Sequence, residues 1–365
     1  MKTAAPDRIG RLAEELHSAG LDAFFAWSPV TMEYLHGYGE GAGERFLTLA
    51  VRADGSVRMI CPALSVTQAR RVGIEDVRPW RDGEDPVEHF RQLASDWNLR
   101  SAIVGVDDEL PAQMLLRMQE ALPAALFKPG SLVISALMRV KDGRELDLMR
   151  KAARIADDSL AAGLAALKPG ATEAQVADAL TEEMRRRGGK PAFCIVATGA
   201  NGAEPHHLSD DTPIREGDVV VLDFGCTVEG YYSDITRMAA VGHASDEAKR
   251  IYEIVLASHQ AGRAAIQPGV AAESIDAAAR KVIEDAGYGE LFMHRLGHGI
   301  GMRGHEEPNI VAGNAHRLEV GNCFSIEPGI YLPGKFGVRI ENIVTVSPDG
   351  HESFNVEPSP TLTVV

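Results

Sequence analysis

The spacing of apolar residues divides the first third of the chain into short alternating helix and strand segments. Asp7 to Gly20 places apolar side chains at helical spacing and ends at a glycine, and residues 111–122 are predicted to form another helix. Short apolar runs typical of strands lie at residues 21–27, 46–51 and 102–106. The alternation predicts an α/β domain, which we assign to residues 1–138, and we find no catalytic motif in it.

A second unit, residues 139–365, begins with two predicted helices. Residues 145–167 form a long amphipathic pattern. Thr172 opens the next helix and Gln175 follows three residues later, which is the pattern of a capping box. That helix reaches the basic cluster 185–187, and basic residues in a last turn suit the helix dipole, so we interpret the cluster as a helix end.

A weak internal repeat runs through the second unit. The motif QPG at 267–269 repeats KPG at 168–170, each between two helical stretches. Downstream, VVVLDFG and CFSIEPG place Asp223 and Glu327 at the same point of two strands. The repeat predicts two half-domains, each of two helices and a β-hairpin, that build one pocket between them.

Turn arithmetic predicts where the carboxylates of the two hairpins lie. A two-residue turn at 228–229 would place Asp223 directly opposite Asp234, and a turn centred in the PGK segment would place Glu327 opposite Glu341. Opposed residues of an antiparallel pair share one face, with Cβ atoms roughly 5 Å apart.

Two such pairs of like charges require either solvent or a cation. One pair alone would fit an edge strand with carboxylates in water, but Asp223 and Glu327 each end an apolar run that predicts a buried strand. Oxygen ligands alone would favour magnesium or calcium. His298 lies between glycines in GHG, and its addition shifts the preference toward manganese, iron, cobalt or zinc.

Composition narrows the partners and the compartment. A formal net charge of −15 repels a polyanion, so we expect no nucleic-acid partner. Charges interrupt every apolar run of the N-terminus, which argues against a signal or transit peptide, and no apolar stretch approaches the ~18 residues of a membrane span. The 4 cysteines form no CxxC pair, so we expect no disulfide and a cytoplasmic location.

Six motifs together resemble one enzyme family. LDFG, SDITR, HRLGHGIG, HEEP, SIEPGIY and GVRIEN are similar to the pita-bread metallopeptidases, over about residues 140–365. That family includes Xaa-Pro dipeptidases (prolidases), aminopeptidase P and methionine aminopeptidase. The N-terminal part resembles the creatinase-type domain of its proline-directed members. The resemblance implies an α/β chain with a pita-bread domain of two pseudo-symmetric halves.

The resemblance also implies a role for each carboxylate. Asp223 would bind the first of two divalent metals, Asp234 and Glu341 would bridge both, and His298 and Glu327 would complete the second. The metals would be manganese, with cobalt, zinc or iron as alternatives. A water between them would ionise, and Glu327 would carry its proton to the leaving amine.

Four further residues receive expected roles. His206 would contact the substrate, with its neighbour His207 as a competing candidate, and His305 would steady the scissile carbonyl. Arg339 would pair with or orient a metal-site acid. Arg45, in the glycine-rich loop 37–45, would hold the substrate carboxylate if that loop reaches an active site, and otherwise belongs to an ordinary flexible hairpin.

The motifs are most similar to those of Xaa-Pro dipeptidases, so we expect a homodimer that hydrolyses proline-containing dipeptides. Aminopeptidase P, which takes longer peptides, is the alternative within the family. Methionine aminopeptidase needs no such N-terminal domain and is disfavoured. A non-catalytic pita-bread binding protein is the alternative from another class, but such proteins lose metal ligands, and all five are present here.

Overall fold

The computed structural model describes residues 7–41 and 43–365, which form two compact units, one ending at Met138 and the other running from Arg139 to Val365. Each unit is described by itself. The N-terminal segment MKTAAP and Ala42 of the 37–45 loop lie outside the described residues. No helix in the described part of the chain is long and apolar enough to cross a bilayer.

The N-terminal unit is built on a mixed sheet of order β4-β3-β2-β1-β5-β6, with antiparallel pairing of β2 to β1 and β3 and parallel pairing elsewhere. Its strands are β1 (Ala23–Ala26), β2 (Thr48–Arg52), β3 (Val57–Pro62), β4 (Val77–Trp80), β5 (Ile103–Val106) and β6 (Leu126–Pro129). Its helices are α1 (Arg8–Ser18), α2 (Pro29–His36), η1 (Ala63–Ser65), α3 (Val66–Arg71), α4 (Pro86–Asp96), α5 (Ala112–Ala121) and α6 (Ser131–Met138).

The predicted elements of this unit are confirmed, and others were not predicted. Asp7 caps α1 by accepting from Gly10 N, and α5 matches the predicted helix 111–122. Strands β3, β4 and β6 and helices α2, α4 and α6 did not emerge from the hydrophobic pattern. The core forms where α4 and α5 cover the sheet, with Phe25 and Phe90 in edge-to-face contact at 5.3 Å between ring centroids.

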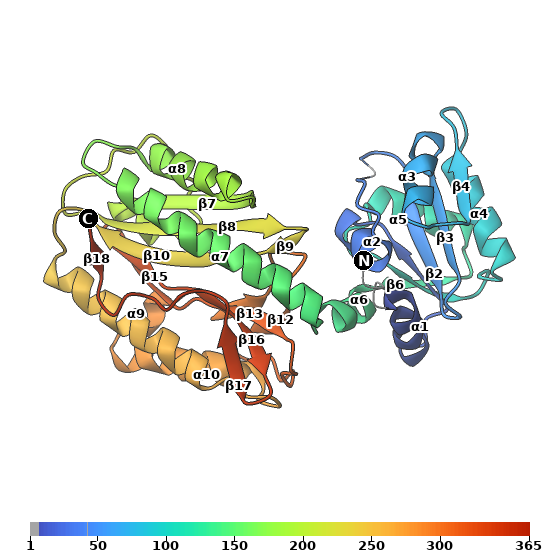
Figure 1. The fold of residues 1–365 in the computed structure, drawn as a ribbon. Coiled ribbons are helices and arrows are strands. Elements are labelled where there is room, and N and C mark those ends of the chain that lie inside the picture. The colour runs from blue at the N-terminus through green and yellow to red at the C-terminus, as the bar shows by residue number, and fades with distance from the viewer. Residues whose placement is uncertain (1–6, 42) are drawn as a thin grey trace. The chain divides into compact units, whose positions relative to one another are not determined.

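The C-terminal unit holds the predicted repeat (Figure 1). Its first half contains α7 (Gly143–Ala166), α8 (Glu173–Arg186), β7 (Lys190–Thr198), η2 (Gly199–Ala203), β8 (Val219–Val228), β9 (Tyr231–Tyr232) and β10 (Ile235–Ala240). The remainder contains α9 (Asp246–Ala264), α10 (Ala272–Asp285), η3 (Gly289–Leu291), β11 (Gly297–Gly299), β12 (Glu306–Ile310), β13 (Cys323–Ile326), β14 (Gly329–Leu332), β15 (Phe336–Arg339), β16 (Asn342–Ser347), β17 (Gly350–Ser353) and β18 (Thr363–Val364).

Equivalent turns open the second helix of each half. Gly170 N donates to Ile214 O at 2.9 Å, and Gly269 N donates to Leu318 O at 2.7 Å. Both glycines have positive φ, 88° and 82°, which explains why the KPG and QPG motifs end in glycine. Thr172 and Gln175 form both bonds of the predicted capping box, which is therefore confirmed.

Strand β8 separates two cores by alternating its side chains. Val220, Leu222 and Phe224 pack with α7 and α8, whereas Val219 and Val221 join the core that contains α9 and α10. Since side chains alternate along a strand, Asp223 lies on the same face as Val219 and Val221. That face is the one that the two halves share, and the candidate site forms there.

The predicted register of the first hairpin is wrong by two residues. The turn residues are Glu229 and Gly230, with φ of 47° and 85°, so Val228 pairs with Tyr231. A two-residue hairpin turn with positive φ at both positions favours a glycine in the turn. The predicted turn at residues 228–229 would have excluded Gly230. Asp223 therefore faces Thr236 instead of Asp234. A slip of two keeps every side chain on its face, so Asp234 still points inward.

The register of the second hairpin is confirmed. Gly329 pairs with Arg339 across β14 and β15, and Ile326 pairs with Asn342 across β13 and β16. Both pairs have the register predicted for a turn centred on Gly334. The same register places Glu327 opposite Glu341, between the β14–β15 pair and the β13–β16 pair. In addition, Glu341 forms an isolated bridge with Thr236 of the first half.

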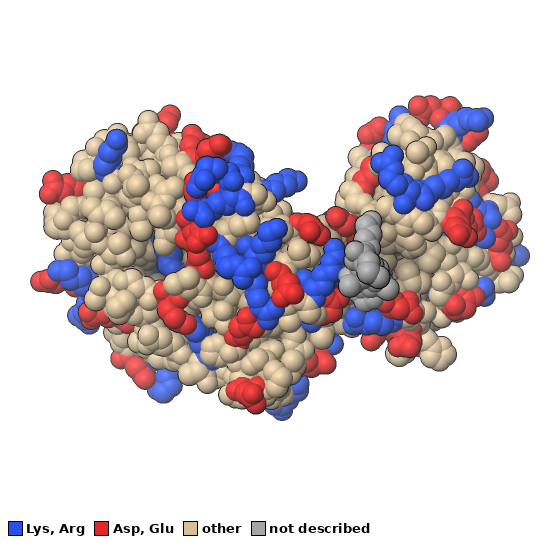
Figure 2. Space-filling model, in the orientation of Figure 1, with Lys and Arg blue, Asp and Glu red and all other residues tan. Residues whose placement is uncertain are grey.

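Charged side chains are mixed on the face of the molecule in view. Figure 2 shows Lys and Arg interspersed with Asp and Glu over the C-terminal unit. Ion pairs of this unit include Arg150 with Glu352 at 2.7 Å and Arg186 with Glu183 at 2.5 Å. The second pair closes the last turn of α8, in agreement with the interpretation of the basic cluster as a helix end.

Candidate metal centre

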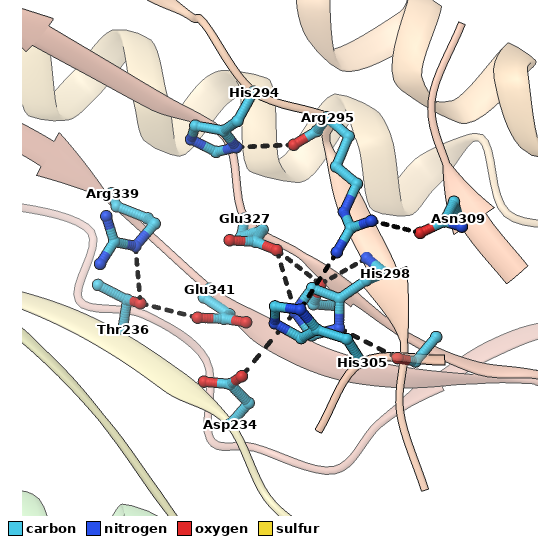
Figure 3. Close-up of polar contacts among 12 residues, drawn as sticks. Asp234, Thr236, His294, Arg295, His298, His305, Asn309, Glu327, Arg339 and Glu341 are labelled. Carbon is cyan, nitrogen blue, oxygen red and sulfur yellow. Dashed lines mark hydrogen bonds and ion pairs between the residues drawn. The ribbon is translucent and has the colours of Figure 1, made fainter. Parts of the chain in front are cut away.

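Five side chains from both half-domains meet between the two halves. Asp223 lies on β8, Asp234 immediately precedes β10, and His298 is the central residue of β11. Glu327 follows β13 and Glu341 precedes β16, at the breaks where the second hairpin changes sheet. Figure 3 shows Asp234, His298, Glu327 and Glu341 pointing toward one another. Ligand atoms of Asp234, His298 and Glu341 all lie within 4.8 Å of each other.

His298 is held as a neutral ring with one free nitrogen. Its Nδ1 lies 3.0 Å from Gly299 O, a bond that the ring must donate, so Nε2 keeps its lone pair. Nε2 is 3.3 Å from Glu327 Oε1 and 4.0 Å from Asp234 Oδ2. Burial, with the nearby His305, lowers the pKa of His298 to about 3. An oriented neutral imidazole is the form that binds a metal.

The glycines beside His298 are required by close packing. A Cβ on Gly297 would collide with Ser325 O, and one on Gly299 would collide with the backbone of Glu307. The same packing lets Ser325 Oγ accept from His298 N at 3.0 Å and donate to Glu327 Oε1 at 3.0 Å. One serine therefore positions two members of the cluster.

The carboxylates repel one another in a buried site. Burial, followed by the charges of Glu341 and Asp223, raises the pKa of Asp234 well above its usual value. Burial and neighbouring carboxylates likewise raise the pKa of Glu341, and the pKa of Glu327 rises to about 7, mainly by burial. Such shifts indicate that the charged forms lack compensation by the protein itself.

Three buried oxygens in this cluster have no hydrogen-bond partner among the described residues: Asp223 Oδ1, Asp234 Oδ1 and Glu341 Oε1. Leaving a buried carboxylate oxygen unpaired is costly, and divalent cations satisfy such atoms. The donor set of four carboxylates and one imidazole suits transition metals. The residues present therefore fit a metal centre.

Arg339 connects both sides of the cluster. Its Nη2 donates to Asp223 Oδ2, its Nη1 donates to Tyr331 Oη at 2.9 Å, and its Nε donates to Thr236 Oγ1 at 3.2 Å. Thr236 Oγ1 in turn donates to Glu341 Oε2 at 2.7 Å. The predicted contact of Arg339 with a metal-site acid is present, and Thr236, which the sequence did not single out, extends it to a second acid.

A second arginine that sequence reasoning missed lies beside His305. The rings of His298 and His305 are 3.9 Å apart between centroids, and His305 Nδ1 accepts from Arg295 Nη2 at 3.4 Å (Figure 3). Arg295 Nη1 donates to Asn309 Oδ1. Its place in HRLGHGIG, three residues before His298, was the available signal, because the residues that follow Arg295 in this motif are buried.

The remaining predicted residues lie in different surroundings. His206 is exposed and lies close enough to His294 and His305 to lower the pKa of both, after the larger effect of burial. His207 bonds to Glu173 at 2.7 Å, so it is engaged elsewhere. Arg45 donates to Asp82 at 2.8 Å within the N-terminal unit, which leaves its predicted substrate role untested.

Comparisons with known proteins find family matches for both units of the chain. Residues 147–348 match Metallopeptidase family M24, and residues 8–140 match the Creatinase/Prolidase N-terminal domain. A probable dipeptidase PepE of Mycobacterium bovis is 39% identical, covering 98% of this chain and 96% of the relative. An Xaa-Pro dipeptidase of Lactobacillus helveticus is 36% identical, with coverage of 95% and 96%.

Solved structures agree. The crystal structure of recombinant prolidase from Thermococcus sibiricus superposes with a TM-score of 0.95 at 33% identity and covers 100% of both chains. The fold class expected from the sequence is confirmed by this likeness. With its creatinase-type N-terminal domain, the chain belongs to metallopeptidase family M24, the pita-bread metallopeptidases.

Proposed function

We propose that this protein hydrolyses Xaa-Pro dipeptides with two divalent cations. The observation that carries the proposal is the buried carboxylate cluster with three unpartnered oxygens, facing a neutral histidine. A buried arrangement of this kind is unstable without cations, so its presence argues for a working metal site. The relatives described above that are named as dipeptidases and prolidases supply the substrate class.

The five residues divide between two cations. Asp223, Asp234, His298, Glu327 and Glu341 would hold the pair, with Asp223 on one side of the site and His298 and Glu327 on the other. In support, Glu341 and Asp234 are the deepest carboxylates of the cluster, and Glu327 is the one nearest to His298 Nε2.

When bound, the cations would polarise the scissile carbonyl and lower the pKa of the attacking water. Glu327 would accept the proton of that water and pass it to the leaving amine. His305 accepts at Nδ1 from Arg295, so its Nε2 carries the proton and can donate to the carbonyl oxygen as charge develops. Arg339 orients Asp223 through the hydrogen bond from Nη2 to Oδ2.

Two side chains near the cluster are available to bind the ends of a substrate. His206 lies at the exposed side of the site, and we assign it to contact the substrate. Arg295 is half-buried beside His305, and its guanidinium contacts the neutral Asn309 and His305 side chains. We assign Arg295 to the free carboxylate of a dipeptide, a role for which Arg45 is the alternative.

The finer properties follow from the same features. A mixed set of carboxylates and imidazole favours manganese, with cobalt, zinc or iron as alternatives. The four cysteines are free, which fits residence in the cytoplasm. A homodimer and no nucleic-acid partner complete the proposal.

A substrate-length panel with metal analysis tests it. Purified protein is analysed for bound metal, supplied with manganese and incubated with Xaa-Pro dipeptides and Xaa-Pro-Xaa tripeptides. Cleavage of dipeptides in preference to tripeptides is the expected result. Cleavage of tripeptides alone would assign an aminopeptidase P activity, whereas no cleavage and no bound metal would assign a non-catalytic binding role.

A further inference from the structure

A buried carboxylate outside the metal centre bonds to both sides of the loop that carries His206. Glu173 is the first residue of α8 and its side chain is fully buried. Its Oε1 accepts from Thr198 N at 2.7 Å and from Asn201 Nδ2 at 3.0 Å, both before His206. Its Oε2 accepts from His207 at 2.7 Å and from Asp210 N at 3.2 Å, both after it.

The hydrogen bonds around Glu173 hold the loop that carries His206 in position. Glu173, His207 and Asp210 place ligand atoms within 4.8 Å of one another, as a metal site would. However, four N–H groups already occupy both oxygens of Glu173, which is the full satisfaction that a buried carboxylate requires. The start of a helix also suits an acidic side chain, so the hydrogen bonds and the helix together account for Glu173 without a cation.

The same loop is anchored to the second half-domain by its backbone. A Cβ on Gly337 would collide with Gly202 O, so η2 and β15 touch where neither has a side chain. Strand β15 ends at Arg339, which contacts Asp223. The loop is thus fixed on one side to the strand of Arg339 and on the other to Glu173. His206 is exposed between these anchors.

We infer that Glu173 is the positioning residue for His206, acting through the four hydrogen bonds that it receives from residues 198–210. This inference rests on the proposed function, because His206 has a role only if the hydrolysis takes place. Glu173 touches neither substrate nor metal ligands. Its contribution is to hold a substrate-contacting side chain in one place, and small displacements of such groups cost much activity.

The internal repeat supplies a matched control. Glu273 lies in the first turn of α10, and its N donates to Asn314 O at 3.0 Å as Glu173 N donates to Thr212 O at 3.2 Å. The Glu273 carboxylate accepts from Gly313 N at 3.1 Å, on a loop with no proposed substrate contact. Substitution of Glu273 therefore tests the general effect of losing an acid at this place in a half-domain.

The experiment combines a double-mutant cycle, measured by kcat/KM, with hydrogen exchange, which does not depend on hydrolysis. Glu173→Gln is expected to lower kcat/KM for a dipeptide by about tenfold to a hundredfold, and Glu273→Gln to leave it unchanged. In a His206→Ala background, Glu173→Gln is expected to add no further loss. Hydrogen exchange of the metal-loaded protein is expected to accelerate at residues 199–210 in Glu173→Gln and not in Glu273→Gln.

Multiplicative losses in the cycle, or unchanged exchange in Glu173→Gln, would overturn the inference. If the wild-type protein cleaves no dipeptide, the proposed function fails, and the exchange measurement alone decides whether Glu173 holds the loop. If Glu173→Gln does not fold, His207→Ala replaces it, since it removes one bond from a half-buried side chain. The same non-additivity with His206→Ala is then expected, with a smaller loss.

Discussion

The hydroxyl of Thr236 donates a hydrogen bond of 2.7 Å to Glu341 Oε2, and this bond joins the two half-domains at the candidate metal centre. Thr236 Oγ1 also accepts a hydrogen bond from Arg339 Nε at 3.2 Å. Across the β8–β10 ladder, Thr236 faces Asp223. The fully buried Thr236 therefore contacts both the predicted ligand Glu341 and Arg339, the arginine that orients Asp223.

Loss of this hydroxyl should weaken metal binding. Thr236→Val keeps the size and branching of the side chain but leaves Glu341 Oε2 without its donor. We expect metal affinity to fall about 10-fold to 100-fold, the usual effect of removing a partner of a metal ligand. Titration of metal-free protein with manganese measures it. Thr236→Ser is the control and should bind as the wild type does; equal weakening in both variants would assign the effect to packing.

Turn counting was sufficient to predict that the acids of each hairpin share one face. The apolar runs that end at Asp223 and Glu327 predicted that this face is buried, and the repeat placed the two acids at matching points. The first turn was predicted wrongly because the sign of φ at Glu229 and Gly230 decides the register, and apolar spacing does not report it. The acids still lie on the predicted face because a register shift of two residues keeps every side chain on its side of the sheet.

Contacts between distant segments were beyond the sequence. Thr236, Arg295 and Glu173 gain their importance from partners far along the chain, and none stands in a pattern that periodicity detects. Strand β6 was missed because its hydrophobic signal is weak; it has no buried residue. The ligand set itself remains a prediction that metal analysis will test.

Removing one charge from the cluster should stabilise the metal-free protein. Asp234→Asn replaces a buried carboxylate whose pKa is raised by burial and by neighbouring acids. We expect the metal-free variant to gain about 1–3 kcal/mol of unfolding free energy and to lose most of the stabilisation by manganese, since ligand binding stabilises only where affinity is retained. Thermal unfolding with chelator and with manganese gives both values. A variant less stable than wild type in chelator would contradict the role of Asp234 as an uncompensated charge.

A buried histidine far from the predicted ligands should make stability depend on pH. His259 on α9 is fully buried, and neither ring nitrogen has a partner among the described residues. Burial, then the charges of Arg263 and Arg237, lowers its pKa well below the usual value. The folded state keeps it neutral, while the unfolded state takes up a proton below about pH 6.5. This contribution to stability is therefore present above that pH and lost as pH falls.

His259→Leu removes both the unpaired atoms and the titration. We expect a gain of about 1–3 kcal/mol in unfolding free energy, larger at acidic than at neutral pH. Urea unfolding of metal-free protein across that pH range measures the slope. His17→Gln, an exposed substitution on α1, is the control and should keep the wild-type slope. A wild-type slope in His259→Leu would show that other groups cause the pH dependence.

Arg295 should distinguish substrates by their free carboxylate. If its guanidinium binds that group, Arg295→Gln loses a charge-assisted contact of about 1.5–3 kcal/mol, which corresponds to a loss of about 10-fold to 100-fold in kcat/KM. The loss should appear with an Xaa-Pro dipeptide and be absent with the corresponding dipeptide amide, whose C-terminus is neutral. Steady-state kinetics on the two substrates measures the difference.

The comparison also separates two roles of Arg295. Its bond to His305 Nδ1 serves both substrates equally, so an equal loss on dipeptide and amide would assign Arg295 to His305 rather than to the carboxylate. Arg45→Ala runs alongside, because Arg45 is the alternative cation. A selective loss of dipeptide activity in Arg45→Ala, with none in Arg295→Gln, would transfer the carboxylate site to the 37–45 loop. Selective loss in Arg295→Gln alone would identify the dipeptide preference as a property of the HRLGHGIG motif.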